Sequence, residues 1–391
     1  MIQWLQISPM NFLERLKLKY FVATRSTGFS LDYFERFFKI FLNHSKVIHW
    51  RGGLPVYSMS TPALYSKPMG NFLSRQIYRT IQNRNMPNLM SFAINDDCNV
   101  SCEHCSFFKG VHDASREVMN TEQAKKVIAD AQELGVSIIN IVGGEPTLRR
   151  DLPEIIRSVD KNLSTVIMFT NGSILAHKAK ELKQAGLDGV YVSIDFSDPK
   201  KHDFFRMSSG LYDKAMQGIA EAMRVGLTVG FSVVITPESF KSGEHERMIE
   251  LAKKTGVHEV IIFDSMPTGR YANRKDLIDN NDWVEDLIGS VKKYNDDPTY
   301  PGVLVYAYAT SFRSVGCSCG TSYFYISPYG DMMSCDFNHA IFGNVLTEPL
   351  YKAWGNLSTK PEFSGAKWGG CKVKDSEYLK KDTVCVSKGC G

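Results

Sequence analysis

The eight residues Cys98-Asn-Val-Ser-Cys102-Glu-His-Cys105 follow an apolar run, Leu89–Ile94, that is expected to form a strand. This spacing presents three thiols from one short loop at the carboxyl end of a strand. Thiolate sulfur suits zinc or an iron–sulfur cluster and suits magnesium or calcium poorly. A structural zinc site is closed and four-coordinate, and His104 would strain the loop as a fourth ligand. Three cysteines around a four-iron cube leave one iron open, so a small molecule can bind there.

A second motif follows the next expected strand. Val136–Val142 runs directly into Gly143-Gly144-Glu145-Pro146. Two glycines let a ligand approach the backbone closely, and the Glu145 carboxylate can hold an ammonium group. A C-x3-C-x2-C loop after one strand and Gly-Gly-Glu-Pro after the next together resemble the radical S-adenosylmethionine (radical SAM) enzymes. Either motif alone is less specific, because three cysteines are also half of a zinc site.

The resemblance implies a reaction. In this family the amine and carboxylate of SAM chelate the open iron of a [4Fe-4S] cluster, held here by Cys98, Cys102 and Cys105. An electron from the reduced cluster splits SAM, and the resulting 5′-deoxyadenosyl radical abstracts hydrogen from an unactivated C–H bond. The residue before the third cysteine is often aromatic in the family and packs on adenine. Here it is His104, whose imidazole can also stack.

The fold class follows from a repeat that begins near residue 88. Four helical patterns end on Gly135, Gly186, Gly226 and Gly256, and glycine is expected just past a helix end. Strands that alternate with helices predict a parallel α/β sheet. Six units match a partial (β/α)6 TIM-like barrel, since a closed barrel needs eight. The expected strands are Ser91–Ile94, Ile138–Val142, Thr165–Phe169, Val190–Ile194, Gly230–Ile235 and Val260–Phe263.

Polar residues at further strand ends complete the expected cofactor site. In similar enzymes such positions contact the SAM ribose and methionyl group, whereas polar residues that merely cap strand ends are the alternative. Arg206 is expected to reach the SAM carboxylate, and Arg270 to bind SAM or substrate. The expected SAM-contacting residues are His104, Gly143, Gly144, Glu145, Pro146, Asn171, Ser193, Asp195, Arg206 and Arg270.

The first 86 residues have a different character and are expected to form a helical, basic and aromatic arm without an obvious strand hairpin. Between residues 12 and 51, Lys and Arg occupy eight positions and acids three. A basic amphipathic segment rich in Phe and Trp can lie in a membrane interface. The alternative is an arm packed on the core. No apolar run is long enough for a membrane-spanning helix, and residues 54–68 are expected to be an irregular connection.

Six further cysteines fall in the last 75 residues. The apolar run Tyr323–Ile326 meets a Pro-Tyr-Gly-Asp turn and returns, so a hairpin should carry cysteines at both ends. This block resembles the SPASM or twitch extensions of radical SAM enzymes, which bind auxiliary [4Fe-4S] clusters. We expect one auxiliary cluster, bound by Cys317, Cys335 and two later cysteines; Cys319 is a ligand or a bystander, and a zinc knuckle is the alternative. The candidate metal ligands in this region are Cys317, Cys319, Cys335, Cys371, Cys385 and Cys390.

Four segments are therefore expected: an arm over residues 1–86, a barrel over 87–271, a connecting helical region over 272–315 and an iron–sulfur domain over 316–391. Clustered thiols without a signal peptide predict a cytoplasmic metalloprotein, with peripheral contact to the inner membrane face through residues 12–51. A net charge of +4 is too small to indicate nucleic acid.

A lipid-like substrate is the first expectation, because the arm suits a membrane. A precursor peptide, as modified by SPASM maturases, is the alternative. A non-catalytic iron–sulfur or zinc protein is a third hypothesis. The expected electron donor is flavodoxin or ferredoxin.

Overall fold

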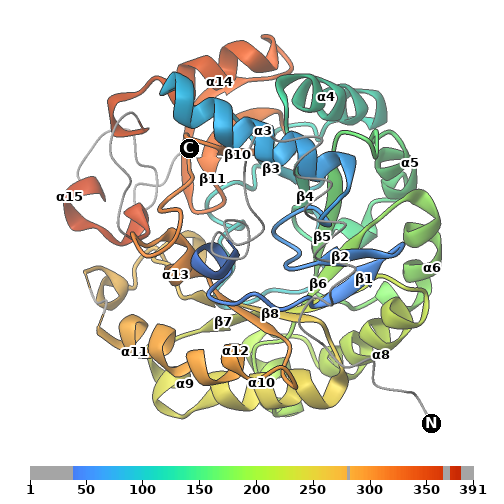
Figure 1. Cartoon of the computed structure of the whole chain (residues 1–391), viewed down its shortest axis with the longest axis vertical. Coiled ribbons are helices and arrows are strands. Elements are labelled where there is room, and N and C mark those ends of the chain that lie inside the picture. The colour runs from blue at the N-terminus through green and yellow to red at the C-terminus, as the bar shows by residue number, and fades with distance from the viewer. Residues whose placement is uncertain (1–37, 280–281, 364–369, 380–391) are drawn as a thin grey trace.

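The computed structural model describes residues 38–279, 282–363 and 370–379. Within these ranges the chain forms an α/β fold around one ten-stranded sheet, which curves into a partial barrel (Figure 1). The six expected parallel strands are all present and adjacent in chain order, which confirms the predicted class. They are β3 (Leu89–Ala93), β4 (Ile138–Val142), β5 (Thr165–Thr170), β6 (Gly189–Ser193), β7 (Thr228–Ile235) and β8 (Glu259–Asp264).

The parallel sheet extends beyond these six strands at both ends. β9 (Gly302–Val305) pairs with β8, and β10 (Tyr323–Ile326) pairs with β3, both parallel. The antiparallel strands β11 (Asp331–Cys335) and β12 (Asn338–Asn344) follow, and β10–β11 is the expected hairpin. Region 272–315 is therefore not only helical. A four-residue apolar run such as Gly-Val-Leu-Val has no period that separates strand from helix.

Helices pack against the outer face of the sheet and bury the main apolar core between the two layers (Figure 1). Gly135 ends the first of them with φ 106°, a left-handed conformation that favours glycine. Asn120 and Gln123 form the capping box at its start. The helices of this part are α4 (Thr121–Leu134), α5 (Leu152–Arg157), α6 (Leu175–Ala185), α7 (Pro199–Phe205), α8 (Leu211–Arg224), α9 (Pro237–Lys241) and α10 (Glu244–Thr255).

The later helices connect or cover the added strands. α11 and α12 lie between β8 and β9, α13 follows β9 directly, and α14 packs on β12. Their bounds are Asp282–Ser290 for α11, Lys292–Asp296 for α12, Tyr306–Thr310 for α13, Leu350–Ser358 for α14 and Ser376–Leu379 for α15.

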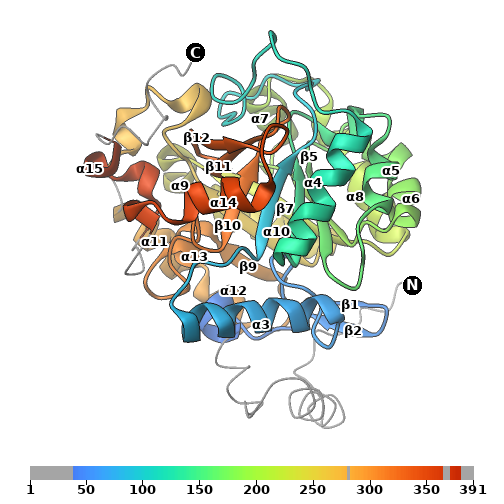
Figure 2. The same cartoon turned by 90° about the horizontal axis from the view of Figure 1, so that it is seen from above.

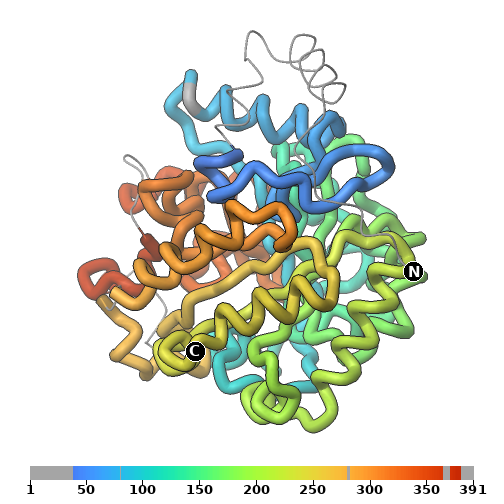
Figure 3. Tube along the Cα trace, turned by 60° about the horizontal axis from the view of Figure 1, so that its bottom comes forward, coloured from blue at the N-terminus to red at the C-terminus, as the bar shows by residue number. Residues whose placement is uncertain are grey.

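The described part of the N-terminal arm covers the amino ends of the barrel strands. It contains a hairpin of β1 (His49–Arg51) and β2 (Leu54–Val56), followed by α3 (Lys67–Gln82). The expectation of no hairpin was therefore wrong, whereas residues 57–66, within the irregular connection expected over 54–68, do contain no helix or strand. Three-residue strands leave too short a pattern to recognise. Figures 2 and 3 show this arm gathered at one end of the molecule, and Figure 2 shows α7 at the opposite end.

Some of the described residues that were expected to face a membrane are used in packing, whereas Ile40 and Trp50 are exposed. Phe38 and Leu42 are buried in a cluster with the barrel floor. Lys46 is also buried, and its Nζ donates to the carbonyls of Tyr294 at 2.6 Å and Asp297 at 2.7 Å. The stretch 12–37 lies outside the described residues. No helix in the described ranges is long and apolar enough to cross a membrane.

Candidate active site

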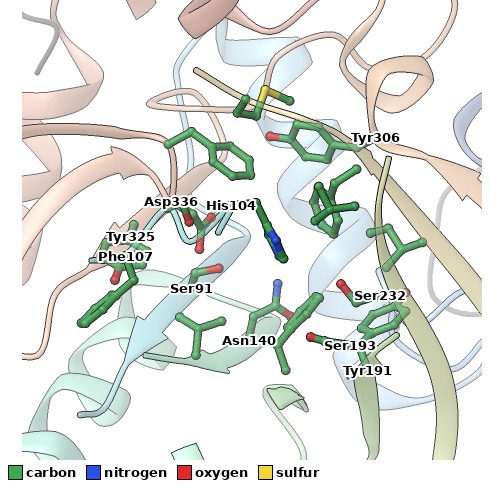
Figure 4. Close-up of a pocket in the computed structure, with 18 of the residues that line it drawn as sticks. Ser91, His104, Phe107, Asn140, Tyr191, Ser193, Ser232, Tyr306, Tyr325 and Asp336 are labelled. Carbon is green, nitrogen blue, oxygen red and sulfur yellow. The ribbon is translucent and has the colours of Figure 1, made fainter. Parts of the chain in front are cut away.

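One cavity of about 400 Å³ occupies the barrel interior. Phe41 and Met59 of the arm line it at one end, and the three cysteines of residues 98–105 line it at the carboxyl ends of the strands. Its side wall includes Gly316, Ser318 and Asp336, the sequence neighbours of Cys317, Cys319 and Cys335. The cavity therefore extends from the first cysteine group to the surroundings of the second (Figure 4).

The first cysteine group lies on a loop that other segments hold in place. Arg270 Nη1 donates to the carbonyl of Cys102 at 2.8 Å and also to that of Ser101. The Arg270 backbone N–H donates to the Cys105 carbonyl at 3.0 Å. Burial raises the pKa of the Cys98 thiol to about 12 and also raises the pKa of Cys102. A bound metal would have to displace these protons, because the ligand is the thiolate.

Gly143 and Gly144 have no room for a side chain, because the segment that leads into the cysteine loop passes close to their Cα atoms. A Cβ on Gly144 would lie 2.0 Å from the carbonyl oxygen of Asp97, and one on Gly143 would lie 2.6 Å from that of Asn95. Gly143 also has φ 143°. Both glycines line the cavity. The two glycines therefore let the cysteine loop pack closely on this turn, and they also leave room for a ligand.

The Glu145 carboxylate is buried, and no cationic side chain of the described residues is paired with it. Its Oε1 accepts from Thr170 Oγ1 at 2.6 Å, and its Oε2 accepts from the backbone N–H of Asn171 at 2.7 Å. No Lys, Arg or His of the described ranges forms an ion pair with it, and burial raises its pKa. An ammonium group in the cavity would supply the missing positive charge. Pro146 does not line the cavity; it begins a short 3₁₀ helix, η1 (Pro146–Leu148).

Arg206 links the fourth expected strand end to the cysteine loop. Its Nε donates to Asp195 Oδ2 at 2.6 Å, and its Nη1 lies 3.6 Å from Cys102 Sγ. Burial alone would lower the pKa of Arg206, but the Asp195 carboxylate outweighs it and raises that pKa. Asp195 is fully buried and is not part of the cavity wall, so it acts through Arg206.

The other expected cofactor contacts divide into two groups. His104, Asn171 and Ser193 line the cavity, and His104 points toward its middle (Figure 4). The imidazole of His104 stacks on Phe205 with ring centroids 4.4 Å apart, and burial lowers its pKa to about 4. A neutral ring can stack on a flat ligand. Arg270, by contrast, is not in the cavity wall; its hydrogen bonds go to the cysteine loop, and its guanidinium lies 5.5 Å from the centroid of the Phe108 ring.

The second cysteine group brings together four of the six C-terminal cysteines. Cys317, Cys319 and Cys335 form one buried cluster. Cys371 is close enough that Cys317 and Cys335 add to the burial that raises its pKa. A hydrogen bond with Cys319 lowers the pKa of Cys317 to about 7. Four sulfurs match the ligand number of one cluster. Cys385 and Cys390 lie outside the described residues.

No three His, Cys, Asp or Glu side chains in the described ranges are close enough to hold a single metal ion.

Several cavity residues were not expected from the sequence. Asn140 and Ser232 project from the middle of β4 and β7, near Ser193 (Figure 4). The sequence signal that could have identified them is a single polar residue within an otherwise apolar strand. Asp264 and Ser265, at the end of β8, each have a buried side-chain oxygen without a hydrogen-bond partner.

Comparisons with known proteins agree with this geometry. The sequence model of the radical SAM superfamily matches residues 93–248, and that of the SPASM iron–sulfur cluster-binding domain matches residues 317–383. The chain thus carries a radical SAM domain over residues 93–248 and a SPASM domain over residues 317–383. Its radical SAM domain binds SAM and a [4Fe-4S] cluster, and its SPASM domain binds auxiliary iron–sulfur clusters.

Individual relatives differ in what they do. The AdoMet-dependent heme synthase of Methanosarcina barkeri is 25% identical over 345 residues, which cover 77% of this chain and 97% of that protein. The GTP 3′,8-cyclase of Peptoclostridium acidaminophilum is 35% identical over 144 residues, or 36% of this chain and 44% of that one. The structure of Streptococcus suis SuiB bound to its precursor peptide SuiA superposes with a TM-score of 0.60 at 15% identity, covering 82% and 80% of the two chains. This last likeness concerns the fold alone.

Proposed function

We propose that this radical SAM enzyme abstracts hydrogen from an unactivated C–H bond of a neutral, largely apolar substrate group and passes the substrate electron to an auxiliary cluster. The observation that carries the proposal is the single cavity whose walls include both the first cysteine loop and the neighbours of the second cysteine group. A substrate held there would face SAM on one side and an electron acceptor on another.

The protein's own residues hold and shield the reactants. Cys98, Cys102 and Cys105 would bind the [4Fe-4S] cluster, Glu145 would pair with the SAM ammonium, and His104 would stack on the adenine. When bound there, the cluster and SAM would supply the radical chemistry that removes hydrogen. The arm closes the amino end of the barrel, so that water does not enter the cavity from that side.

The charge of the cavity wall restricts the substrate. Arg206 is the only Lys or Arg among the described residues of the wall, and Asp195 already neutralises it. Glu145 and Asp336 add acidic groups, and the Asp264 carboxylate is already paired with Lys374. A polyanion such as GTP would therefore be buried without counter-charges, which costs several kcal/mol. A neutral group, for example an apolar side chain of a peptide, suits the wall better.

The lipid-like substrate expected from the sequence has lost much of its support. It depended on a membrane-binding arm, and residues Phe38, Leu42 and Lys46 of that arm are buried against the barrel. A tetrapyrrole is a second candidate, because the heme synthase aligns with this chain over 97% of its own length.

The test is reductive cleavage of SAM. Anaerobically reconstituted protein, reduced with dithionite, should form 5′-deoxyadenosine from SAM, and the variant Cys98→Ala/Cys102→Ala/Cys105→Ala should form none. The wall charge predicts that added GTP leaves the rate unchanged. Nucleoside formation that survives in the triple variant would exclude the proposed cluster, and its absence from loaded wild type would exclude the reaction.

A further inference from the structure

The end of α7 packs directly on the cysteine loop. The backbone N–H of Glu103 donates to the Phe205 carbonyl at 3.2 Å, and the Phe205 ring stacks on His104. The next residue, Arg206, reaches Cys102 Sγ at 3.6 Å. Residues 205 and 206 thus form one layer of side chains between the first cluster site and the exterior.

The residues on either side of this pair are large, apolar and exposed. Phe204 is 81% exposed and Met207 is 65% exposed. Met207 also has φ 53°, a backbone conformation that is uncommon for a residue with a side chain. Exposed apolar groups gathered at one place mark interaction sites more often than single ones do. Figure 2 shows α7 at the end of the barrel opposite the arm, so the arm does not cover this place.

Two lysines lie close to Phe204 and Met207 in the sequence. Lys200 and Lys201 are exposed, and neither forms an ion pair with another described residue. The carboxylates of the same region accept hydrogen bonds from other groups: Asp198 accepts from the N–H of Lys201, and Asp203 accepts from the N–H groups of Gly210 and Tyr212. Glu103 of the cysteine loop accepts from Tyr271 Oη at 3.3 Å. The surface therefore offers two free ammonium groups next to two apolar side chains.

We infer that Phe204, Met207, Lys200 and Lys201, here termed the α7 patch, form the docking surface for an acidic one-electron carrier protein that reduces the first cluster. The inference rests on the proposed function, which needs one external electron for each SAM cleaved. A small apolar centre with a charged rim is typical of short-lived electron-transfer complexes. A carrier seated on the α7 patch would bring its redox centre within one layer of side chains of Cys102.

The experiment follows reduction of the clusters, before any SAM chemistry, by stopped-flow loss of visible absorbance under anaerobic conditions. Flavodoxin hydroquinone and reduced ferredoxin serve in turn as donors, and dithionite serves as the small-molecule reductant. Phe204→Ser/Met207→Ser should lower the second-order rate constant with a carrier protein by about tenfold and leave the dithionite rate unchanged. Lys200→Gln/Lys201→Gln should lower it at low salt, with the difference vanishing at high salt.

The matched control is Ile81→Ser/Tyr351→Ser, which removes an exposed apolar pair of similar size from α3 and α14. It should behave as wild type with every reductant. Equal rates for the α7 variant and wild type with both carriers would overturn the inference, as would an equal loss with carrier and dithionite. If clusters are reduced normally but no 5′-deoxyadenosine forms from SAM, the proposed function fails while the docking result stands.

Discussion

Two buried carboxylates show how position determines the role of a residue. Glu145 and Glu259 are both fully enclosed, and burial raises the pKa of each because neither has a cationic partner in the described chain. Glu259 lies at the barrel floor, where it accepts from Tyr191 Oη at 2.6 Å and from the Met59 N–H at 2.8 Å. Glu145 faces the cavity beside the cysteine loop. Only Glu145 is placed to meet a ligand ammonium group.

Glu145→Gln should therefore weaken SAM binding. Removing the charge leaves a neutral hydrogen bond where a charge-assisted one was available, and we expect the dissociation constant to rise about ten- to hundredfold. The change of the cluster's electron paramagnetic resonance spectrum on SAM addition measures it. Glu259→Gln removes an equally buried charge at the far end and should leave the constant unchanged. Equal affinities in both variants would contradict the assigned role of Glu145.

Motif residues were easier to predict than the residues that support them. The three cysteines, Glu145 and His104 were expected because their two motifs resemble those of radical SAM enzymes, and the structure brings them to one cavity. Asp195 and Arg270 were expected at the cofactor but lie behind Arg206 and the cysteine loop. Sequence position can place a residue at a strand end, but it does not show which way the side chain points. Asn140 and Asp264 were missed for the same reason.

At the scale of elements, the strands that follow a helix ending on glycine, β4, β6, β7 and β8, were all predicted, because each repeats the same local pattern. Of the strands that were missed, β12 has seven residues and the others are short. β1, β2 and β9 have three or four residues, and their pairing is decided by contacts distant in sequence. The arm was misjudged in a similar way, since an apolar helical face looks alike whether it packs on a membrane or on a barrel floor.

Lys46→Met tests whether the arm is a fixed part of the barrel. The variant leaves the carbonyls of Tyr294 and Asp297 without their buried donor, so we expect the free energy of unfolding to fall by about 1–3 kcal/mol. Denaturant unfolding followed by tryptophan fluorescence would measure the loss. Lys39→Met, in the same segment but exposed, should cost almost nothing. A stability loss that is equal in the two variants would show that the Lys46 contacts do not hold the arm.

At the scale of the whole molecule, one sheet unites segments that the sequence divides. β10 of the C-terminal region pairs with β3, and β9 of the connecting region pairs with β8. The hairpin that carries the second cysteine group is therefore continuous with the barrel. Arg116, in the segment after the first cysteines, adds a paired contact to Asp331 at 2.5 and 2.9 Å. These contacts fix the two cysteine groups around one cavity.

The central claim is that two separate iron–sulfur sites flank this cavity, and counting iron tests it most directly. Anaerobically reconstituted wild type should contain about eight irons per chain, as expected for two four-iron clusters. Cys98→Ala/Cys102→Ala/Cys105→Ala and Cys317→Ala/Cys335→Ala should each contain about four. A wild-type protein with about four irons, all lost in the first variant, would contradict the account, because the second cysteine group would then hold no cluster.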